Sequence, residues 1–281
     1  MMKTAIVFIL ILTPSMIYPQ RECKITYISN EGFLIEAEGG KILIDALFGK
    51  IDEDWCDSPS ENTMELMENS ENPFNDVDII AITHNHRDHF NESIVVKHLL
   101  SNPRGIVICP EQVGEILIKN PDYGAFSDRI VSLTPGMFCD TLIDVSGIPV
   151  RILRLEHSYY MIEDSITGIM SNRHQNIENL GYIFNIGGIK IFHCGDTNPL
   201  NEEEYSRFSI YKEEIDIAFL ERLFYAYEKT ETINKYIKPG NIILMHINPN
   251  NISMFLDYFS QQKEIIIFEN KMETITLNIE E

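Results

Sequence analysis

The segment 83–89 concentrates side chains that can bind metal ions. Four of its residues are potential ligands: His84, His86, Asp88 and His89. The segment follows the apolar run 77–82, which we interpret as a buried strand with one polar interruption. Two histidines spaced i, i+2 cannot share a helical face, but a turn lets both converge on one cation. The aspartate and the last histidine are then free to bind a second cation. The spacing therefore indicates a two-metal hydrolytic centre.

Three more candidate ligands stand at the ends of other apolar strands, and these are His157, Asp196 and His246. Gly195 precedes the aspartate and leaves it little steric hindrance. Imidazole and carboxylate ligands suit zinc, iron or manganese, whereas a set of soft thiolates is absent. A single histidine after a strand is more often structural, but seven ligand-type residues at four strand ends are hard to obtain by accident.

The elements that must position these residues follow a simple order. Strands at 24–29, 33–37 and 41–46, separated by Asn-, Glu- and Gly-rich turns, predict an antiparallel meander. Further strands are expected at 77–82, 106–109, 129–133, 141–145, 150–157, 182–186, 189–193, 215–220, 241–246 and 264–268. Helices are expected at 92–100, 110–119, 231–236 and 253–261, and long loops at 49–75 and 158–178. Meanders followed by alternating strands and helices fit two sheets flanked by helices.

At this point the sequence resembles a known family. His84-x-His86-x-Asp88-His89, followed in order by His157, Gly195-Asp196-Thr197 and His246, is similar to the motif set of the metallo-β-lactamase superfamily. The resemblance covers residues 24 to 270, including the strand-and-aspartate element 42–45. It implies an α+β fold, a four-layer αββα sandwich with a dinuclear site at one edge of the two sheets.

The resemblance also implies a role for each candidate ligand. His84, His86 and His157 would hold the first of two divalent metal ions. Asp88, His89 and His246 would hold the second, and Asp196 would bridge the two ions through its carboxylate oxygens. Zn²⁺ is the expected metal, with Mn²⁺ or iron as alternatives.

Asp196 separates branches of the superfamily. True β-lactamases place Cys or Ser at this step, whereas an aspartate resembles lactonases, thioesterases and phosphodiesterases. The segments 179–184 and 187–196 are similar to the branch that includes the ascorbate-phosphate lactonase and the N-acyl-ethanolamine phospholipase D. The long loops 49–75 and 158–178 depart from that lactonase type.

A pair of such ions would lower the pKa of a bridging water enough to supply hydroxide near neutral pH. The resemblance therefore implies hydrolysis of an ester, lactone or phosphodiester in a small-molecule substrate, with Asp88 as the hypothetical proton acceptor. Two other classes stay open. One is a di-iron oxidoreductase built on the same ligands, and the other is a catalytically silent binding protein, which the intact ligand set disfavours.

Other residues have two interpretations each. His193 could orient a ligand from behind or be an ordinary buried histidine. His174 could reach the substrate or be a solvated loop residue, and His98 is expected to be structural. Tyr159, Tyr160 and the aromatic run 224–227 could line a substrate pocket or belong to the core.

Composition excludes several kinds of partner. A net charge of −21 argues against nucleic acid and anionic membrane surfaces, because binding to phosphates requires clustered Lys and Arg. No interior run approaches the roughly 20 apolar residues that span a bilayer, so stable membrane insertion is not expected. Five cysteines without a C-x-x-C pair imply neither a disulfide framework nor a Cys-only zinc site.

The start of the chain has the layout of a secretory signal peptide. A weakly basic beginning is followed by the apolar stretch 5–12, and the sequence turns polar at 20–22. We therefore predict a signal peptide at 1–20, one metallo-β-lactamase-like domain at 23–281, and export to the periplasm or the medium. The alternative is a first buried strand.

Overall fold

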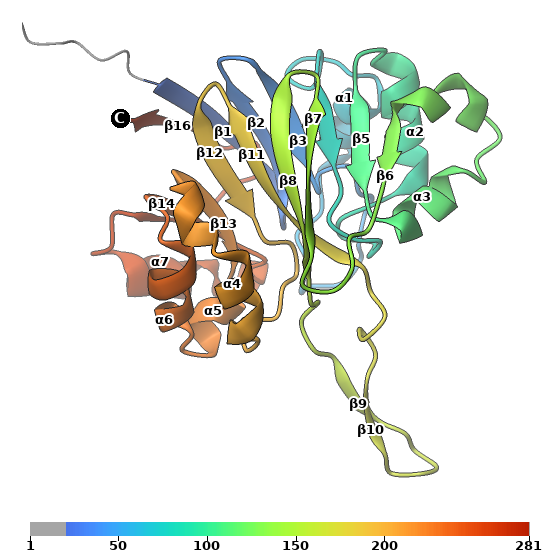
Figure 1. Cartoon of the computed structure of the whole chain (residues 1–281). Helices are drawn as coiled ribbons and strands as arrows, with labels where there is room; N and C mark the ends of the chain where they lie inside the picture. Colours follow the sequence, from blue (N-terminus) through green and yellow to red (C-terminus); the bar gives the residue numbers. More distant parts are fainter. Residues whose placement is uncertain (1–20, 281) are drawn as a thin grey trace, which may run out of the picture.

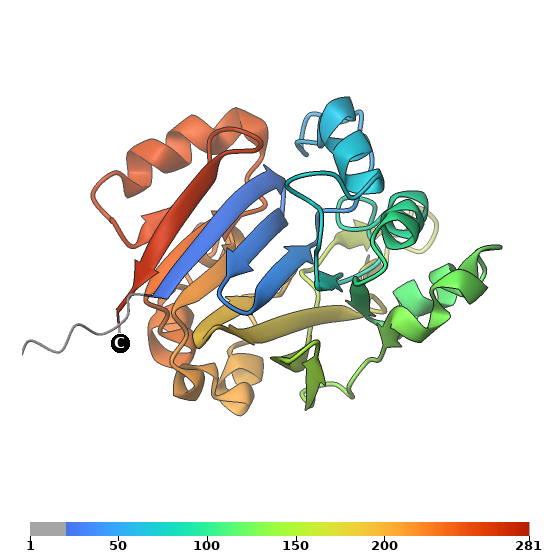
Figure 2. The ribbon, with the colours of Figure 1, turned by 90° about the horizontal axis from the view of Figure 1, so that it is seen from above.

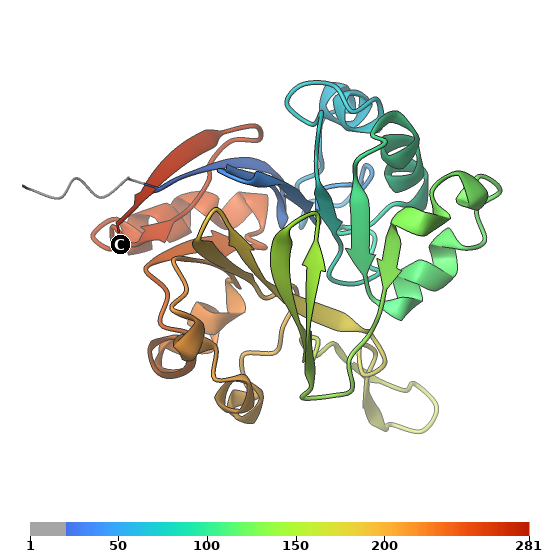
Figure 3. The same cartoon turned by 45° about the horizontal axis from the view of Figure 1, so that its top comes forward.

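Two seven-stranded sheets stacked face to face form the centre of the molecule, and helices cover both outer faces (Figure 1). The computed structural model describes residues 21–280, so the predicted signal peptide at 1–20 lies outside the described residues. Figure 3 shows the sheets between their helical layers. The predicted αββα sandwich of the α+β class is confirmed.

The first sheet begins with the predicted antiparallel meander and continues with parallel strands. In spatial order it contains β16 (Thr274–Ile279), β1 (Arg21–Ser29), β2 (Gly32–Ala37), β3 (Gly40–Ile44), β4 (Ile79–Ala81), β5 (Ile106–Cys109) and β6 (Ile130–Ser132). The strands β3 to β6 pair in parallel, and β3 to β5 are rich in buried aliphatic residues, as expected for strands covered on both faces.

The strand β16 was not predicted from the sequence. It pairs antiparallel with β1, with Arg21 opposite Ile279, so two segments far apart in the chain lie side by side (Figure 2). Its apolar residues alternate with exposed polar ones over only six positions, which is a weak signal at the edge of a sheet.

The second sheet combines hairpins with parallel strands. In spatial order it contains β15 (Ile265–Ile266), β14 (Asn241–Met245), β13 (Ile217–Glu221), β12 (Ile189–His193), β11 (Asn179–Ile186), β8 (Ile148–Leu155) and β7 (Asp140–Val145). Gly187 and Gly188 both adopt positive φ angles of 57° and 79° and form the predicted tight turn between β11 and β12.

Short helices cover the outer faces. Beside the first sheet lie α1 (Glu61–Glu68), α2 (Glu92–Ser101), α3 (Glu111–Leu117), η1 (Tyr123–Ala125) and η2 (Ser127–Arg129). Beside the second sheet lie α4 (Glu202–Phe208), η3 (Ile210–Glu213), α5 (Leu223–Ala226), α6 (Thr230–Thr232), the π-helix η4 (Ile233–Ile237), η5 (Pro249–Asn251) and α7 (Ile252–Phe259).

Three expectations about these segments need correction. The predicted loop 49–75 contains α1, because Ser60 caps a helix by accepting a hydrogen bond from the amide of Thr63. Pro110 is the N-cap of α3 rather than its first residue. The predicted loop 158–178 contains the hairpin of β9 (Met161–Glu163) and β10 (Met170–Asn172), which projects from the body of the molecule (Figure 1).

Two hydrophobic cores hold the layers together. The larger lies between the sheets and includes Phe33, Tyr182 and Phe219, all at most 1% exposed. The second joins the first sheet to α1–α3 through residues such as Met67 and Leu99. Among the described residues, no helix is long and apolar enough to cross a membrane.

His98 is structural, as predicted, and links two helices. Its Nδ1 lies 2.6 Å from the carbonyl oxygen of Met67, and Asn102 lies 3.4 Å from its Nε2. Burial lowers the pKa of His98 below its ordinary value, although the bond to Met67 opposes this effect. The neutral imidazole therefore stabilises the fold above the ordinary pKa. That contribution is lost as pH falls, because the unfolded chain then takes up the proton.

Replacing His98 with Phe should lower the free energy of unfolding by about 2 kcal/mol at pH 8, because the Met67 carbonyl and Asn102 both lose their contact with the imidazole. The loss should shrink at pH 5.5, where the wild-type imidazole no longer contributes fully. Urea denaturation at the two pH values measures both quantities. The control is Lys97→Ala, on the same helix as His98, which removes an exposed ion pair with Glu68 of α1 and should cost less than about 1 kcal/mol. An equal loss for His98→Phe at both pH values would contradict this account.

Candidate metal centre

The predicted ligands meet at loops that follow four strands. The segment 84–89 follows β4, while His157, Asp196 and His246 follow β8, β12 and β14. The segment after β4 is a tight turn in which the amides of His89 and Phe90 both donate to the carbonyl of His86. Phe90 is buried and Asn91 caps α2, so the turn is anchored where it leaves the site.

One cluster combines three histidines with one carboxylate. Donor atoms of His84, His86, His157 and Asp196 all lie within 4.8 Å of one another. The Nε2 atoms of His84 and His157 are 3.3 Å apart, and Oδ2 of Asp196 lies 3.9 Å and 3.6 Å from them. Two nitrogens on a tetrahedral zinc ion, each about 2.0–2.1 Å from it, are separated by about 3.3 Å. The cluster therefore has the dimensions of a metal site.

A second cluster shares Asp196. Donor atoms of Glu31, His89, Asp196 and His246 lie within 4.8 Å of one another. Oδ1 of Asp196 is 3.3 Å from Nε2 of His89. Asp88 borders this cluster, with Oδ2 3.7 Å from Nε2 of His89 and 3.6 Å from Nε2 of His246. Oδ1 of Asp196 is therefore closest to His89, while Oδ2 faces His84 and His157 and also lies 3.9 Å from Nε2 of His246.

Several buried polar atoms in these clusters have no hydrogen-bond partner. They are both carboxylate oxygens of Glu31, Nε2 of His89 and Oδ1 of Asp196. Leaving such atoms unpaired in the interior costs free energy. Imidazole and carboxylate atoms that lie within 4.8 Å of one another in the interior can surround a cation, so the residues present are suited to bind divalent metals.

Burial and mutual charge set the protonation of the first cluster. Burial lowers the pKa of His86 and of His157 to about 4, against the opposing attraction of Asp196. Burial, and then repulsion by His89, lower the pKa of His84 well below its ordinary value. These three imidazoles are neutral at pH 7 and can donate lone pairs to a metal.

Burial and neighbouring charges shift the pKa values of Asp196 and Glu31 in opposite directions. Burial would raise the pKa of Asp196, but His246, His89 and His84 outweigh it and hold that pKa well below the usual range. Burial alone would lower the pKa of His89, but the carboxylates of Asp196, Asp88 and Asp45 raise it well above its ordinary value. Burial and the neighbouring Asp196 raise the pKa of Glu31 well above the usual range.

Asp45, at the end of β3, orients two histidines. Its Oδ1 accepts from the amide of Thr83 at 2.8 Å, and its Oδ2 accepts from the Thr83 hydroxyl at 2.6 Å. The same Oδ2 lies 2.9 Å from Nδ1 of His89, so Nε2 of that ring points to the cluster. The Thr83 hydroxyl is also 3.0 Å from Nδ1 of His84. Such contacts fix the ring orientation of metal-binding histidines.

Gly195 lets Asp196 reach its position. Gly195 has a φ of +56°, and a Cβ there would come within 2.4 Å of Oδ1 of Asn179 and 2.9 Å of Cβ of Thr83. The same Asn179 oxygen accepts the Asp196 amide at 3.2 Å. The glycine thus permits the close approach that the neighbouring asparagine fixes.

His193 and His174, for which the sequence left two interpretations each, lie in different places relative to the ligand clusters. His193 is buried and connects two loops, with Nε2 3.4 Å from the carbonyl of Glu31 and Nδ1 accepting the Gly195 amide at 3.2 Å. Burial lowers the pKa of His193 to about 4, so it is neutral. His174 lies beside the first cluster, with Nδ1 3.1 Å from Nδ1 of His157.

The clusters open onto a cavity of about 850 Å³. Aromatic side chains on its wall include Trp55, Tyr159, Tyr160 and Tyr227, while Asp88, Asp196 and His246 line it on the metal side. Phe224, from the predicted aromatic run, is instead fully buried in the core. A small organic molecule fits a cavity of this size beside both clusters.

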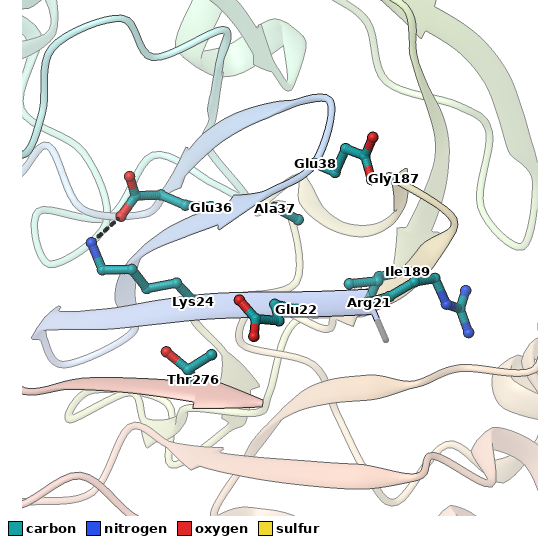
Figure 4. A pocket seen from close by; sticks show the side chains of 9 residues that line it. All are labelled: Arg21, Glu22, Lys24, Glu36, Ala37, Glu38, Gly187, Ile189 and Thr276. Carbon is teal, nitrogen blue, oxygen red and sulfur yellow. Dashed lines mark ion pairs between the residues drawn. The ribbon is translucent and has the colours of Figure 1, made fainter. Parts of the chain in front are cut away.

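A second cavity, of about 450 Å³, lies between β1, β2 and the β11–β12 turn and is shown in Figure 4. None of its lining residues belongs to the two clusters. Lys24 and Glu36 form an ion pair of 2.8 Å within its lining. The cavity beside the clusters is therefore the candidate site.

Sequence reasoning missed Glu31 and Asn30, which lie in the turn between β1 and β2. Asn30 donates to Oδ2 of Asp88 at 3.2 Å, and Glu31 joins the second cluster. The turn was interpreted only as a break between strands. A charged residue beside glycine in such a turn gives no local signal of burial, because its burial depends on residues that are distant in sequence, such as His193.

Two mixed sheets enclosed by helices, with ligand-bearing loops after four strands, define the metallo-β-lactamase class of fold. A family model described as a beta-lactamase superfamily domain matches residues 41–262. The match covers well over half of the chain, so this chain belongs to the metallo-β-lactamase superfamily.

Relatives and solved structures agree with that membership. A "UPF0173 metal-dependent hydrolase" of Methanosarcina mazei is 25% identical over 228 residues, covering 81% of this chain and 84% of that protein. A protein of the same name from Polaromonas is 22% identical over 81% of this chain and 78% of its own length. The structure of Igni18, a metallo hydrolase of Ignicoccus hospitalis, has a TM-score of 0.59 at 17% identity, covering 92% of this chain and 100% of that one.

Gly195→Ala should displace Asp196 and lower the free energy of unfolding by about 2 kcal/mol or more, because the added Cβ meets Asn179 and Thr83 at a strained φ. Metal content after dialysis should fall together with stability. The control is Gly124→Ala, whose Cβ would meet nothing within 4 Å and should change stability by less than about 0.5 kcal/mol. Wild-type metal content in Gly195→Ala would refute the positioning role.

Proposed function

We propose that this protein is a metal-dependent hydrolase that acts on a small-molecule ester, lactone or phosphodiester through a dinuclear metal centre. The observation that carries the proposal is the pair of ligand clusters that share Asp196 beside an open cavity. Asp196 belongs to both clusters, and a carboxylate shared in this way is suited to bridge two cations.

The assignment of ligands follows the two clusters. His84, His86 and His157 would hold the first ion, and Asp88, His89 and His246 would hold the second. Asp196 would bridge them, with Oδ2 on the side of His84 and His157 and Oδ1 on the side of His89. Two such ions supply Lewis-acid activation of water and of the bond to be cleaved.

Asp88 is the best placed proton acceptor among the described residues. It lines the cavity, and Asn30 donates to its Oδ2 at 3.2 Å and fixes its orientation. Burial would raise the pKa of Asp88, but His89 and His246 outweigh burial and hold that pKa below its usual value. The carboxylate is therefore ionised at neutral pH and able to take a proton from water that attacks the substrate.

The relatives support the hydrolytic class, since both curated relatives are named metal-dependent hydrolases. The aspartate at position 196 favours ester and phosphodiester chemistry over β-lactam hydrolysis, as the resemblance implies. The wall of the cavity supports a small organic substrate with an apolar part, because Tyr159, Tyr160 and Tyr227 are about half exposed there.

Metal analysis tests the dinuclear centre. The wild-type protein should hold two equivalents of divalent metal, and His157→Ala and His246→Ala should each hold fewer, because each removes a nitrogen from one cluster. Elemental analysis after dialysis gives the content, and Tyr227→Phe, on the same cavity wall, serves as the control. A single equivalent in the wild type would contradict the proposal, and an iron-specific visible spectrum would favour redox chemistry instead.

Asp88→Asn should lower kcat about 100-fold or more on the best substrate of a chromogenic ester, lactone and phosphodiester panel, because the amide cannot accept a proton. The metal content should be reported for the same sample. Asp128→Asn, an exposed aspartate far along the chain, provides the matched control. Full metal content with near-native turnover in Asp88→Asn would end the proposed role.

A further inference from the structure

Glu31 is an acidic residue in an unusual place. Its side chain is fully buried, yet neither of its carboxylate oxygens has a hydrogen-bond partner among the described residues. An ionised carboxylate in the interior is costly unless a positive charge or several donors surround it. No Lys or Arg pairs with Glu31 among the described ion pairs; its charged neighbours there are His89 and His246.

The turn that carries Glu31 is held tightly against the site. Gly32 allows a close approach, because a Cβ there would meet the Cα of Ala46 at 2.8 Å. His193 fixes the Glu31 carbonyl from behind. Asn30, the preceding residue, binds Asp88. The turn therefore supplies two residues to the second cluster. Asn30 orients the Asp88 carboxylate, and Glu31 contributes a carboxylate of its own.

The side of His246 that faces Glu31 identifies its role. Oε1 of Glu31 lies 3.9 Å from Nε2 of His246, and this nitrogen also faces Asp88 at 3.6 Å and Asp196 at 3.9 Å. Glu221, another buried glutamate, lies instead 3.8 Å from the opposite ring nitrogen, Nδ1. Oε1 of Glu31 is thus on the ligand side of the His246 imidazole, and Glu221 is behind that ring. Oε2 of Glu31 lies 3.8 Å from Nδ1 of His89, the nitrogen that faces Asp45, so Oε1 is the oxygen that would bind the ion.

The two clusters differ in chemical hardness when Glu31 is counted. The first offers three imidazole nitrogens and one carboxylate. The second offers the two imidazoles of His89 and His246 and up to three carboxylates, from Asp88, Asp196 and Glu31. Oxygen-rich sets of five or more ligands favour Mn²⁺ and similar hard cations relative to zinc, whereas nitrogen-rich sets of four favour zinc.

We propose that Glu31 is a direct ligand of the second metal ion, and that it shifts the selectivity of this position from zinc toward a harder cation such as Mn²⁺. The inference rests on the proposed dinuclear centre and adds a fifth protein ligand to its second position. The two positions then differ in metal preference, so the centre can hold two different metals.

The test is Glu31→Gln in the full chain, which keeps the size of the side chain and removes its charge. Mn²⁺ binding, followed by the electron paramagnetic resonance signal of free Mn²⁺, should weaken by at least about tenfold, because even partners outside the first coordination sphere contribute 10–100-fold to metal affinity. Zn²⁺ affinity of the first position should change much less. At the second position, the ratio of Mn²⁺ affinity to Zn²⁺ affinity should fall, because the charged oxygen ligand that favours Mn²⁺ is lost.

Two further variants separate a ligand from a structural residue. Glu31→Asp keeps the charge but shortens the side chain, and it should also lose Mn²⁺ affinity. Glu204→Gln removes the charge of another fully buried glutamate that belongs to neither cluster, and it should leave both affinities unchanged. The metal-free Glu31→Gln protein should melt close to the wild-type temperature, because the substitution keeps the size of the side chain and breaks no hydrogen bond of the Glu31 carboxylate among the described residues.

The outcomes distinguish this inference from the proposed function. Two metals in the wild type with unchanged Mn²⁺ affinity in Glu31→Gln would overturn the role of Glu31 and leave the dinuclear centre intact. Fewer than two metals in the wild type would overturn the proposed function itself. A metal-free Glu31→Gln protein that melts well below the wild type would show that Glu31 supports the fold instead.

Discussion

The whole site depends on one buried carboxylate, that of Asp196. It lies within 3.9 Å of imidazole nitrogens of His84, His157, His89 and His246. An ionised group in such a place is stable only while those rings, or cations bound between them, face it. This carboxylate is kept in position by Gly195, which precedes it, by Asn179, which accepts the Asp196 amide, and by His193, which accepts the amide of Gly195. The loops that surround the site are arranged around a fixed charge.

The position of that charge explains why the fold needs two sheets. Glu31 and the segment 84–89 come from loops of the first sheet, while His157, Asp196 and His246 follow strands of the second. Each sheet alone holds an incomplete set of ligands. The apolar core between the sheets, which is close-packed, therefore also sets the distances between ligand atoms. Small changes in that packing are transmitted to the metal site.

Local patterns were enough to predict much of this arrangement. Apolar runs with ligand-type residues at their ends predicted β4, β8, β12 and β14 and indicated the seven candidate ligands, because a buried strand has a strong signal in sequence. Glu31 and β16 could not be found in this way. The burial of Glu31 arises from contacts with 45–46 and with His193, and the pairing of β16 with β1 joins residues more than 240 positions apart. Both features depend on contacts that no local window contains.

The pairing of β1 with β16 places a constraint on the order of events during synthesis. Backbone hydrogen bonds join Tyr27, close to the turn that carries Glu31, to Met272 and Glu273. The first sheet therefore stays open along the edge of β1 until nearly the whole chain has left the ribosome, and His246 also emerges late. Contacts of such long separation form slowly. During elongation the candidate ligands thus stay incomplete until His246 and the segment 272–273 have both emerged.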